Sequence, residues 1–199
     1  MIIKDALSHI QRCHRSMRDS LYQNYHDNER WVIVHDDRKH FECLLLETFQ
    51  AWLSRYTVLK KREYFREAFD QFDPMRIATF DQQKIEELMS NNLIIRNRSK
   101  IVAAIVNARV FLQIQQQYWS WDHFIRSYSN YKPIINHIDK NTDCPSRSAL
   151  SDRISADLKH YGMKFIWSTI VDAHLQATGQ INDHENTCRK KHLWSHKSI

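Results

Sequence analysis

The sequence predicts an all-α fold, and two observations lead to this prediction. Apolar residues recur with a helical period in several segments; in the stretch 100–117 the apolar stripe consists of Ile101, Ile105, Ala108 and Leu112. No alternation of apolar and polar residues lasts five positions, so no segment reads as a half-buried strand. The sequence therefore favours a bundle of about eight helices.

The helices are expected in the following order. Residues 40–53 are apolar nearly all round, which suggests a helix buried at the centre. Residues 58–72 are amphipathic and end before Asp73-Pro74, where a helix stops readily. Further helices are expected over 82–90, 100–117, 121–128, 149–161 and 164–177. The stretch 128–148, which contains Pro133 and Pro145, is the main expected loop.

Glycine is scarce in this chain. At an average usage of about 7%, roughly 14 glycines would be expected, and the sequence has 2. Gly162 and Gly179 each follow an apolar-periodic segment, where a left-handed residue commonly ends a helix. Both are therefore predicted to be helix C-terminal caps.

The composition fits one globular domain over residues 1–199, with 42% hydrophobic and 26% charged residues. No apolar run approaches the roughly 20 residues of a membrane span, and the first residues lack the pattern of a secretory signal. We therefore expect a cytoplasmic monomer whose cysteines stay reduced. The net charge of +6 fits an anionic partner such as nucleic acid, although charge alone is a weak indication.

Cysteine and histidine occur near both ends of the chain in a pattern that suits a metal ion. His184 and Cys188 lie four positions apart, and Cys13 and His26 lie near the other end. Together they have the Cys₂His₂ composition of a structural zinc site, which would join the two terminal segments. The chain has 12 histidines, so accidental pairs are numerous, and His14, His35 and His192 are competing candidates.

Two further features carry possible chemistry. In residues 91–100, a helix stops, a short apolar turn follows, and Arg96, Arg98 and Lys100 accompany the start of the next helix, an arrangement that can bind a phosphate. Without further support, a solvated basic turn is the favoured interpretation. Glu47 is an acid within the apolar segment 40–53, either in a functional pocket or on a thin polar edge.

Seven segments taken together resemble the DNA-3-methyladenine glycosylase I family. They are YHDNE (25–29), the helix around Glu47, TVLKKRE (57–63), FDQFDP (69–74), IIRNRSKI (94–101), NAR (107–109) and INDH (181–184). The resemblance runs from about residue 12 to residue 188, with the motifs in family order. It implies a helix-hairpin-helix DNA glycosylase fold with an N-terminal extension (1–11), a hairpin (91–100) and a basic tail (189–199).

The resemblance also implies a function and its residues. The family hydrolyses the N-glycosidic bond of 3-methyladenine in double-stranded DNA after flipping the base, without cleaving the strand. Glu47 falls on the catalytic, base-contacting glutamate, and Tyr25 and Arg55 fall on positions that contact the base. Arg96, Arg98 and Lys100 fall on the DNA-binding hairpin. The remaining assignment is a structural zinc ion held by Cys13, His26, His184 and Cys188.

The chain departs from the family pattern at aromatic and small positions. The family has tryptophan where Arg15, Arg30, Arg55 and Arg126 stand, and glycine at several positions that include Trp31, Trp52, Trp119 and Trp167. Arg55 brings a positive charge towards a cationic base, and Trp52 could occupy the space that the base needs. An alternative function is therefore a relative that binds DNA without excising bases. A third possibility is a glycosylase with a shifted choice of base, if Arg55 favours a neutral lesion. Asp172 is a weaker candidate for stabilising the sugar cation.

Overall fold

The computed structural model describes residues 11–194, and within them the chain forms two compact units. Unit 1 contains residues 11–33, 133–145 and 176–194, so it combines both ends of the described chain with a central loop. Unit 2 contains Val34–Lys132 and Ser146–Leu175. The expected N-terminal extension lies almost wholly outside the described residues, and so does the second half of the basic tail.

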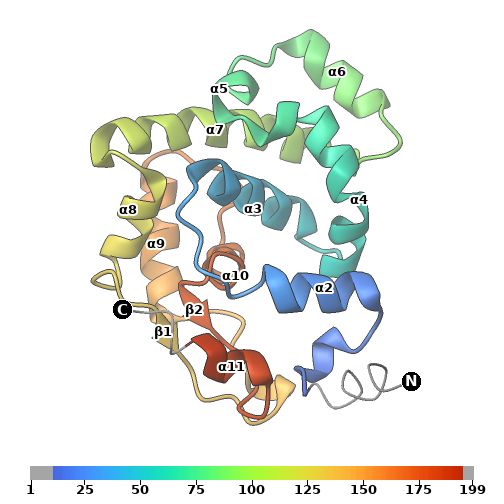
Figure 1. Cartoon of the computed structure of the whole chain (residues 1–199). Coiled ribbons are helices and arrows are strands. Elements are labelled where there is room, and N and C mark those ends of the chain that lie inside the picture. The colour runs from blue at the N-terminus through green and yellow to red at the C-terminus, as the bar shows by residue number, and fades with distance from the viewer. Residues whose placement is uncertain (1–10, 195–199) are drawn as a thin grey trace. The chain divides into compact units, whose positions relative to one another are not determined.

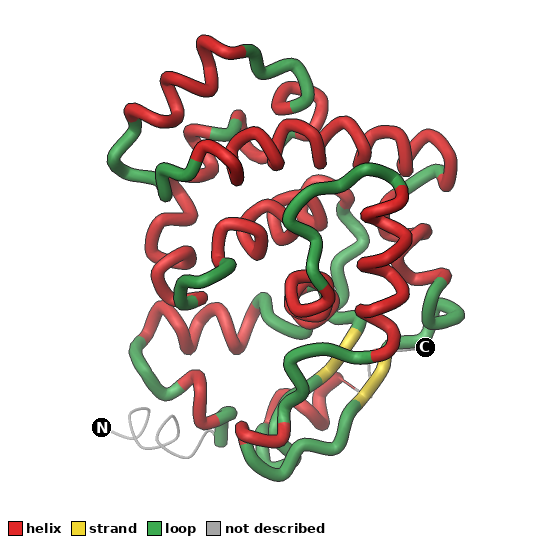
Figure 2. The backbone as a smooth tube through the Cα atoms, turned by 180° about the vertical axis from the view of Figure 1, so that it is seen from behind, coloured by secondary structure: helices red, strands yellow, loops and turns green. Residues whose placement is uncertain are grey.

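Unit 1 contains short elements joined by long segments (Figure 1). They are η1 (His14–Ser16), α2 (Ser20–Asn28), β1 (Ile134–Ile135), η3 (Asn141–Asp143), β2 (Ile181–Asn182) and α11 (Arg189–Trp194). The two strands pair in parallel, with Ile134 opposite Ile181 and Ile135 opposite Asn182, and they lie side by side in Figure 2. A strand of two residues has no periodicity to recognise, which is why the sequence predicted only a loop here.

Unit 2 contains the long helices. They are α3 (Asp37–Gln50), α4 (Arg55–Ala68), α5 (Pro74–Ile77), α6 (Gln82–Ser90), α7 (Arg98–Tyr118), α8 (Trp121–Ser127), α9 (Ala149–His160) and most of α10 (Ser168–Ala177), with η2 (Asp70–Phe72) between α4 and α5. The predicted all-α class is confirmed for this unit. Helix α7 packs against α3, α5, α6 and α8 and therefore forms its centre.

Aromatic rings fill the core of unit 2. Phe41 on α3 meets Phe111 on α7 edge to face at a centroid distance of 5.1 Å, and Phe111 stacks on Trp121 at 4.4 Å. Phe49 and Phe65 join α3 to α4 in the same way, at 4.8 Å. All five rings are at most 1% exposed, so burial of large apolar surface stabilises this unit.

Local sequence explains where most helices begin. In α2, α3, α4 and α6 to α9 the N-cap side chain accepts a hydrogen bond from a backbone N–H of the first turn. These N-cap residues are Asp19, Asp36, Ser54, Asp81, Asn97, Ser120 and Ser148. The sequence placed α6 correctly at both ends. It extended the helix after Ser54 too far, because η2 turns away through left-handed residues such as Gln71 (φ 58°).

Both glycines adopt the left-handed conformation expected of them. Gly162 has φ 100° and follows α9, and Gly179 has φ 74° and follows α10. Three tryptophans share this conformation, namely Trp31 (φ 61°), Trp52 (φ 70°) and Trp119 (φ 67°). At these three positions the family resemblance implies glycine, so the backbone keeps the glycine conformation although the side chain is large.

None of the described helices is both long enough and apolar enough to cross a membrane.

Candidate metal centre and carboxylate site

The four residues predicted to hold zinc come together in unit 1. Cys13 lies just before η1, His26 is on α2, and His184 and Cys188 lie between β2 and α11. All four side chains are buried, and one ligand atom of each lies within 4.8 Å of the others. The structure thus joins residues that are 171 positions apart, Cys13 and His184.

The donor set fits a tetrahedral zinc ion. Sγ of Cys13 and Sγ of Cys188 both lie 3.3 Å from Nδ1 of His184, and Sγ of Cys188 lies 3.6 Å from Nε2 of His26. Zn–N and Zn–S bonds of about 2.0–2.3 Å place neighbouring ligands roughly 3.3–3.8 Å apart. With four protein ligands no position is left for a reactive water, so the site is structural.

Neighbouring groups orient the ligands. Nδ1 of His26 lies 2.8 Å from the Asp27 carboxylate, which leaves Nε2 turned towards the cluster. The backbone N–H of Glu185 donates to Sγ of Cys13 at 3.3 Å. The Trp31 ring lies 4.1 Å from the His184 ring and is 3% exposed, so it excludes water from the cluster.

The two thiols interact strongly. Hydrogen bonds from the Cys13 thiol, which has the largest effect, and with His184 and His26 together lower the pKa of Cys188 to about 2, although burial opposes this shift. The hydrogen bond between the two thiols raises the pKa of Cys13. Cys188 is therefore the more acidic of the two thiols, and a cation in the cluster would favour release of the proton of Cys13 as well.

The competing histidines lie elsewhere. His14 is exposed. His35 pairs with Asp122 at 2.9 Å in unit 2. The side chain of His192 lies outside the described residues.

Glu47 is the centre of a second buried polar site, in unit 2. It projects from α3 and is 4% exposed, so the interpretation of a thin polar edge is wrong. Its Oε1 accepts a hydrogen bond from Nη1 of Arg55 at the start of α4. Its Oε2 is buried too, and none of the described residues donates a hydrogen bond to it. A buried acceptor without a donor is costly, and it is the kind of group that a ligand satisfies.

Trp52 does not fill the space beside Glu47. Its side chain is 99% exposed because the left-handed backbone after α3 directs it into solvent. The expectation that Trp52 could close a pocket is therefore wrong, and that argument for a protein without excision activity falls away. Arg55 was expected to contact the base. In this structure its guanidinium instead forms an ion pair with the carboxylate of Glu47.

Tyr25 belongs to unit 1. It lies on α2 directly before the cluster ligand His26, it is half-buried, and its ring meets Tyr22 at 6.2 Å.

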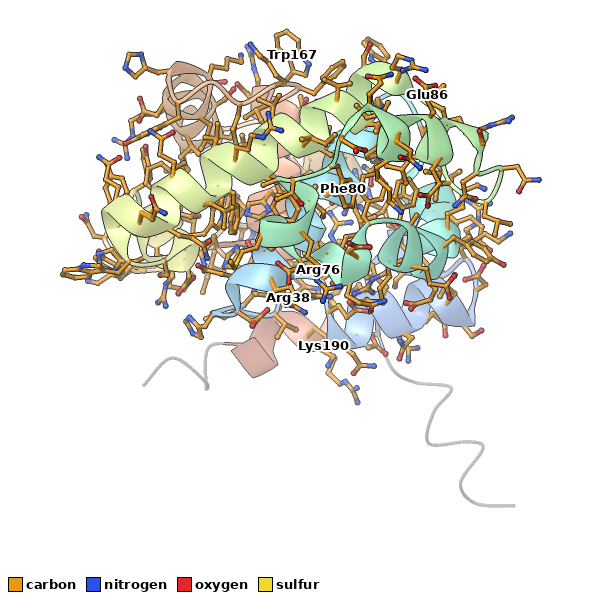
Figure 3. All side chains as sticks on the ribbon, turned by 90° about the horizontal axis from the view of Figure 1, so that it is seen from above. Arg38, Arg76, Phe80, Glu86, Trp167 and Lys190 are labelled. Atoms are coloured by element: carbon orange, nitrogen blue, oxygen red, sulfur yellow. The ribbon has the colours of Figure 1, made fainter. Side chains whose placement is uncertain are left out.

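The predicted hairpin lies between α6 and α7, also in unit 2. Lys61 donates to the carbonyl of Leu93 at 2.6 Å and so fixes the turn. Arg96 is exposed. Arg98 is exposed as well and forms two hydrogen bonds with Glu86, at 2.8 and 2.5 Å. Glu86 projects outwards from α6 in Figure 3. Two arginines of the predicted DNA-binding set are thus presented to solvent.

Lys100 does not lie where a phosphate could reach it. It is 5% exposed, and its ammonium donates to the carbonyls of Phe49 and Ala51 at 3.0 and 2.7 Å. These carbonyls end α3, where a cation satisfies acceptors that the helix leaves unpaired. The expected DNA contact of Lys100 is therefore replaced by a structural role in holding the end of α3.

Asp172 also has a structural explanation. It is 2% exposed and accepts a hydrogen bond at 3.0 Å from the hydroxyl of Ser148, the N-cap of α9. The carboxylate therefore braces α10 against the start of α9.

Sequence reasoning missed the partner of Glu47. Arg55 is eight positions further on and lies on another helix, beyond the turn that ends α3, so spacing along one helix does not relate the two residues. The only available signal was the need of a buried carboxylate for a cation.

Comparisons with known proteins agree with this geometry. A family profile described as methyladenine glycosylase matches residues 15–192. DNA-3-methyladenine glycosylase 1 of Escherichia coli K12 is 41% identical over 179 residues, which are 90% of this chain and 96% of that protein. DNA-3-methyladenine glycosylase of Haemophilus influenzae is 40% identical over 177 residues, which are 89% and 96% of the two chains.

Solved structures show the same fold. A crystal structure of 3-methyladenine DNA glycosylase I is 43% identical, covers 90% of this chain and 98% of its own, and superposes with a TM-score of 0.87. The Staphylococcus aureus enzyme, solved for its recognition of 3-methyladenine, is 34% identical and has a TM-score of 0.87 over 92% of this chain and 97% of its own. The mostly helical fold is that of the methyladenine glycosylases, and the buried Cys₂His₂ cluster is consistent with a structural zinc site. The chain belongs to the methyladenine glycosylase family.

Proposed function

We propose that this protein is a DNA-3-methyladenine glycosylase that removes alkylated bases from double-stranded DNA by hydrolysis. Family membership supports the reaction class. The observation that carries the proposal is Glu47, a buried carboxylate with one oxygen that no described residue satisfies. Such an oxygen suits an N–H donor of a base that has left the helical stack.

The chemistry asks little of the protein beyond binding. Methylation at N3 makes the adenine cationic in DNA, so the base is already a good leaving group. A carboxylate that accepts a hydrogen bond from the base holds it in place while water attacks the sugar. Zinc would hold the two terminal segments of unit 1 together and take no part in the reaction.

The other residue roles follow from the family resemblance. Tyr25 would contact the extruded base, and Arg96 and Arg98 would bind backbone phosphates beside the hairpin. Their exposure suits that contact. Arg98 would exchange Glu86 for a phosphate, which costs little because both side chains are about half exposed. We further propose a monomer that acts in the cytoplasm.

Release of free 3-methyladenine from methylated duplex DNA tests the proposal. The Glu47→Gln variant keeps the shape of the side chain but removes its charge, and we expect release to fall about 100-fold or more. The matched control is Glu42→Gln, since Glu42 is an equally buried acid of α3 that forms ion pairs with Arg62 and Arg66 of α4 and with Lys39 of α3. No release by the folded, zinc-loaded parent would refute the function. Equal loss in both variants would refute the assignment to Glu47.

A further inference from the structure

Arg55 distinguishes the carboxylate site of this chain. It is the first residue of α4, and its guanidinium reaches across the turn to Glu47 on α3. The Arg55 side chain is 14% exposed and that of Glu47 is 5% exposed, so solvent screens the pair weakly. The hydrogen bond engages only Oε1, and Oε2 still awaits a donor.

The ion pair between Arg55 and Glu47 changes the net charge of the site at which a ligand of Glu47 would bind. An isolated buried carboxylate attracts a cation strongly, whereas a carboxylate already paired with a guanidinium forms a site of zero net charge. The guanidinium also repels a positive base at short range. What remains is a hydrogen-bond acceptor, and an acceptor serves neutral and cationic bases alike if they present an N–H group.

Among the residues that the structure describes, the nearby cations Lys100, Arg62 and Arg66 are engaged elsewhere and do not replace Arg55. The ammonium of Lys100, near the end of α3, is occupied by the carbonyls of Phe49 and Ala51. The cations Arg62 and Arg66 of α4 pair with Glu42, more than one turn before Glu47 on α3. Arg55 therefore controls the charge at Glu47.

We propose that Arg55 is a specificity-determining residue that lowers the preference of the site for cationic bases. This inference rests on the proposed function, because it assumes that the base binds at Glu47. Removing the guanidinium should leave the carboxylate to favour the positive charge of 3-methyladenine, and release of that base should become faster. A residue with a merely supporting role would have the opposite effect, since its loss loosens the site.

The test measures single-turnover release of two lesions by the zinc-loaded, full-length protein. One substrate is methylated duplex DNA, which supplies cationic 3-methyladenine, and the other is a duplex with one hypoxanthine, a neutral base with an N–H donor. The variants are Arg55→Gln and, in case the glutamine variant folds poorly, Arg55→Trp; both remove the charge. Arg55→Lys keeps it. Arg62→Gln is the matched control, because Arg62 and Glu42 form a second α3–α4 pair with side chains that are 15% and 5% exposed.

We expect Arg55→Gln and Arg55→Trp to release 3-methyladenine about tenfold faster than the parent, with no gain for hypoxanthine. Arg55→Lys and Arg62→Gln should show no gain. Slower or unchanged release of 3-methyladenine by both uncharged variants would overturn the inference. An equal gain for both bases would also overturn it, because the effect would then be steric. If no variant and no parent releases 3-methyladenine, the proposed function itself fails, and the inference with it.

Discussion

Unit 1 and unit 2 differ in what lies at their centres. Unit 1 joins three segments of the chain around buried polar groups, and the stretch from Gln176 to His184 contains many of them. Its two ends meet at two thiols and two imidazoles. Unit 2 is a set of helices around stacked and edge-to-face aromatic rings. One unit thus depends on coordination and hydrogen bonds, which are directional, and the other on apolar burial, which is not.

This contrast bears on function. The cluster of unit 1 has every group that a closed zinc site needs. The carboxylate site of unit 2 is incomplete by comparison, because one oxygen of Glu47 is paired with Arg55 and the other lacks a donor. A metal site whose four positions are all taken by protein ligands stabilises the fold. A buried carboxylate oxygen without a hydrogen-bond donor can bind a ligand.

The largest effect should follow from removing a ligand of the cluster. Cys188→Ser should abolish zinc binding and destabilise unit 1 by on the order of 5 kcal/mol or more, because structural zinc contributes about 10–16 kcal/mol in small domains. Hydrogen exchange should then accelerate in residues 11–33 and 176–194, while α7 in unit 2 stays protected. Cys144→Ser is the control, since Cys144 lies outside the cluster. If hydrogen exchange accelerated in both units together, the conclusion that the two units are stabilised by different interactions would be refuted.

A core substitution in unit 2 should come next. Phe111→Ala should lower the free energy of unfolding by about 3–5 kcal/mol, because the ring is fully buried between Phe41 and Trp121. Zinc content should stay at one ion per chain. Val102→Ala on the same helix is 40% exposed and should cost less than about 1 kcal/mol. Denaturant unfolding with parallel zinc analysis measures both.

The two glycines offer a smaller and sharper comparison. At Gly179 an added Cβ would lie 2.5 Å from the backbone N of Ile33, so Gly179→Ala must displace main chain in unit 1. At Gly162 the nearest atom is 3.9 Å away, and only the left-handed backbone opposes alanine. We expect a loss of about 1–2 kcal/mol for Gly162→Ala and clearly more for Gly179→Ala. Equal melting temperatures of the two variants would contradict this order.

The smallest effect should be a gain in stability. Trp119 ends α7 with φ 67° and is 88% exposed, so glycine would relieve the backbone and lose little packing. Trp119→Gly should stabilise unit 2 by about 1 kcal/mol. Trp167→Gly is the control, because Trp167 is 58% exposed and does not share the left-handed conformation. Thermal unfolding of both variants should show a rise for the first alone.

Some residues behaved as their type and position predicted, and others did not. The capping role of Gly179 was evident, because glycine after an apolar-periodic segment suits a left-handed turn. Lys100 was misassigned, because a basic residue at the start of a helix can serve a phosphate or a carbonyl of its own chain with equal ease. The sequence singled out Glu47 as a candidate functional acid, but it did not predict the ion pair of Glu47 with Arg55.

The sequence by itself determined most of the helices and the two glycine caps, and its resemblance to the family selected the four metal ligands from among the competing histidines. Helices follow from a period that neighbouring residues carry, whereas the residue types only suggested a Cys₂His₂ site and the order of the family motifs identified its four ligands. Only the tertiary structure decided that the ligand atoms converge, that Trp52 points into solvent, that Lys100 is buried, and that Arg55 neutralises Glu47. These facts depend on the direction of side chains after the chain has turned, and no local pattern records that direction.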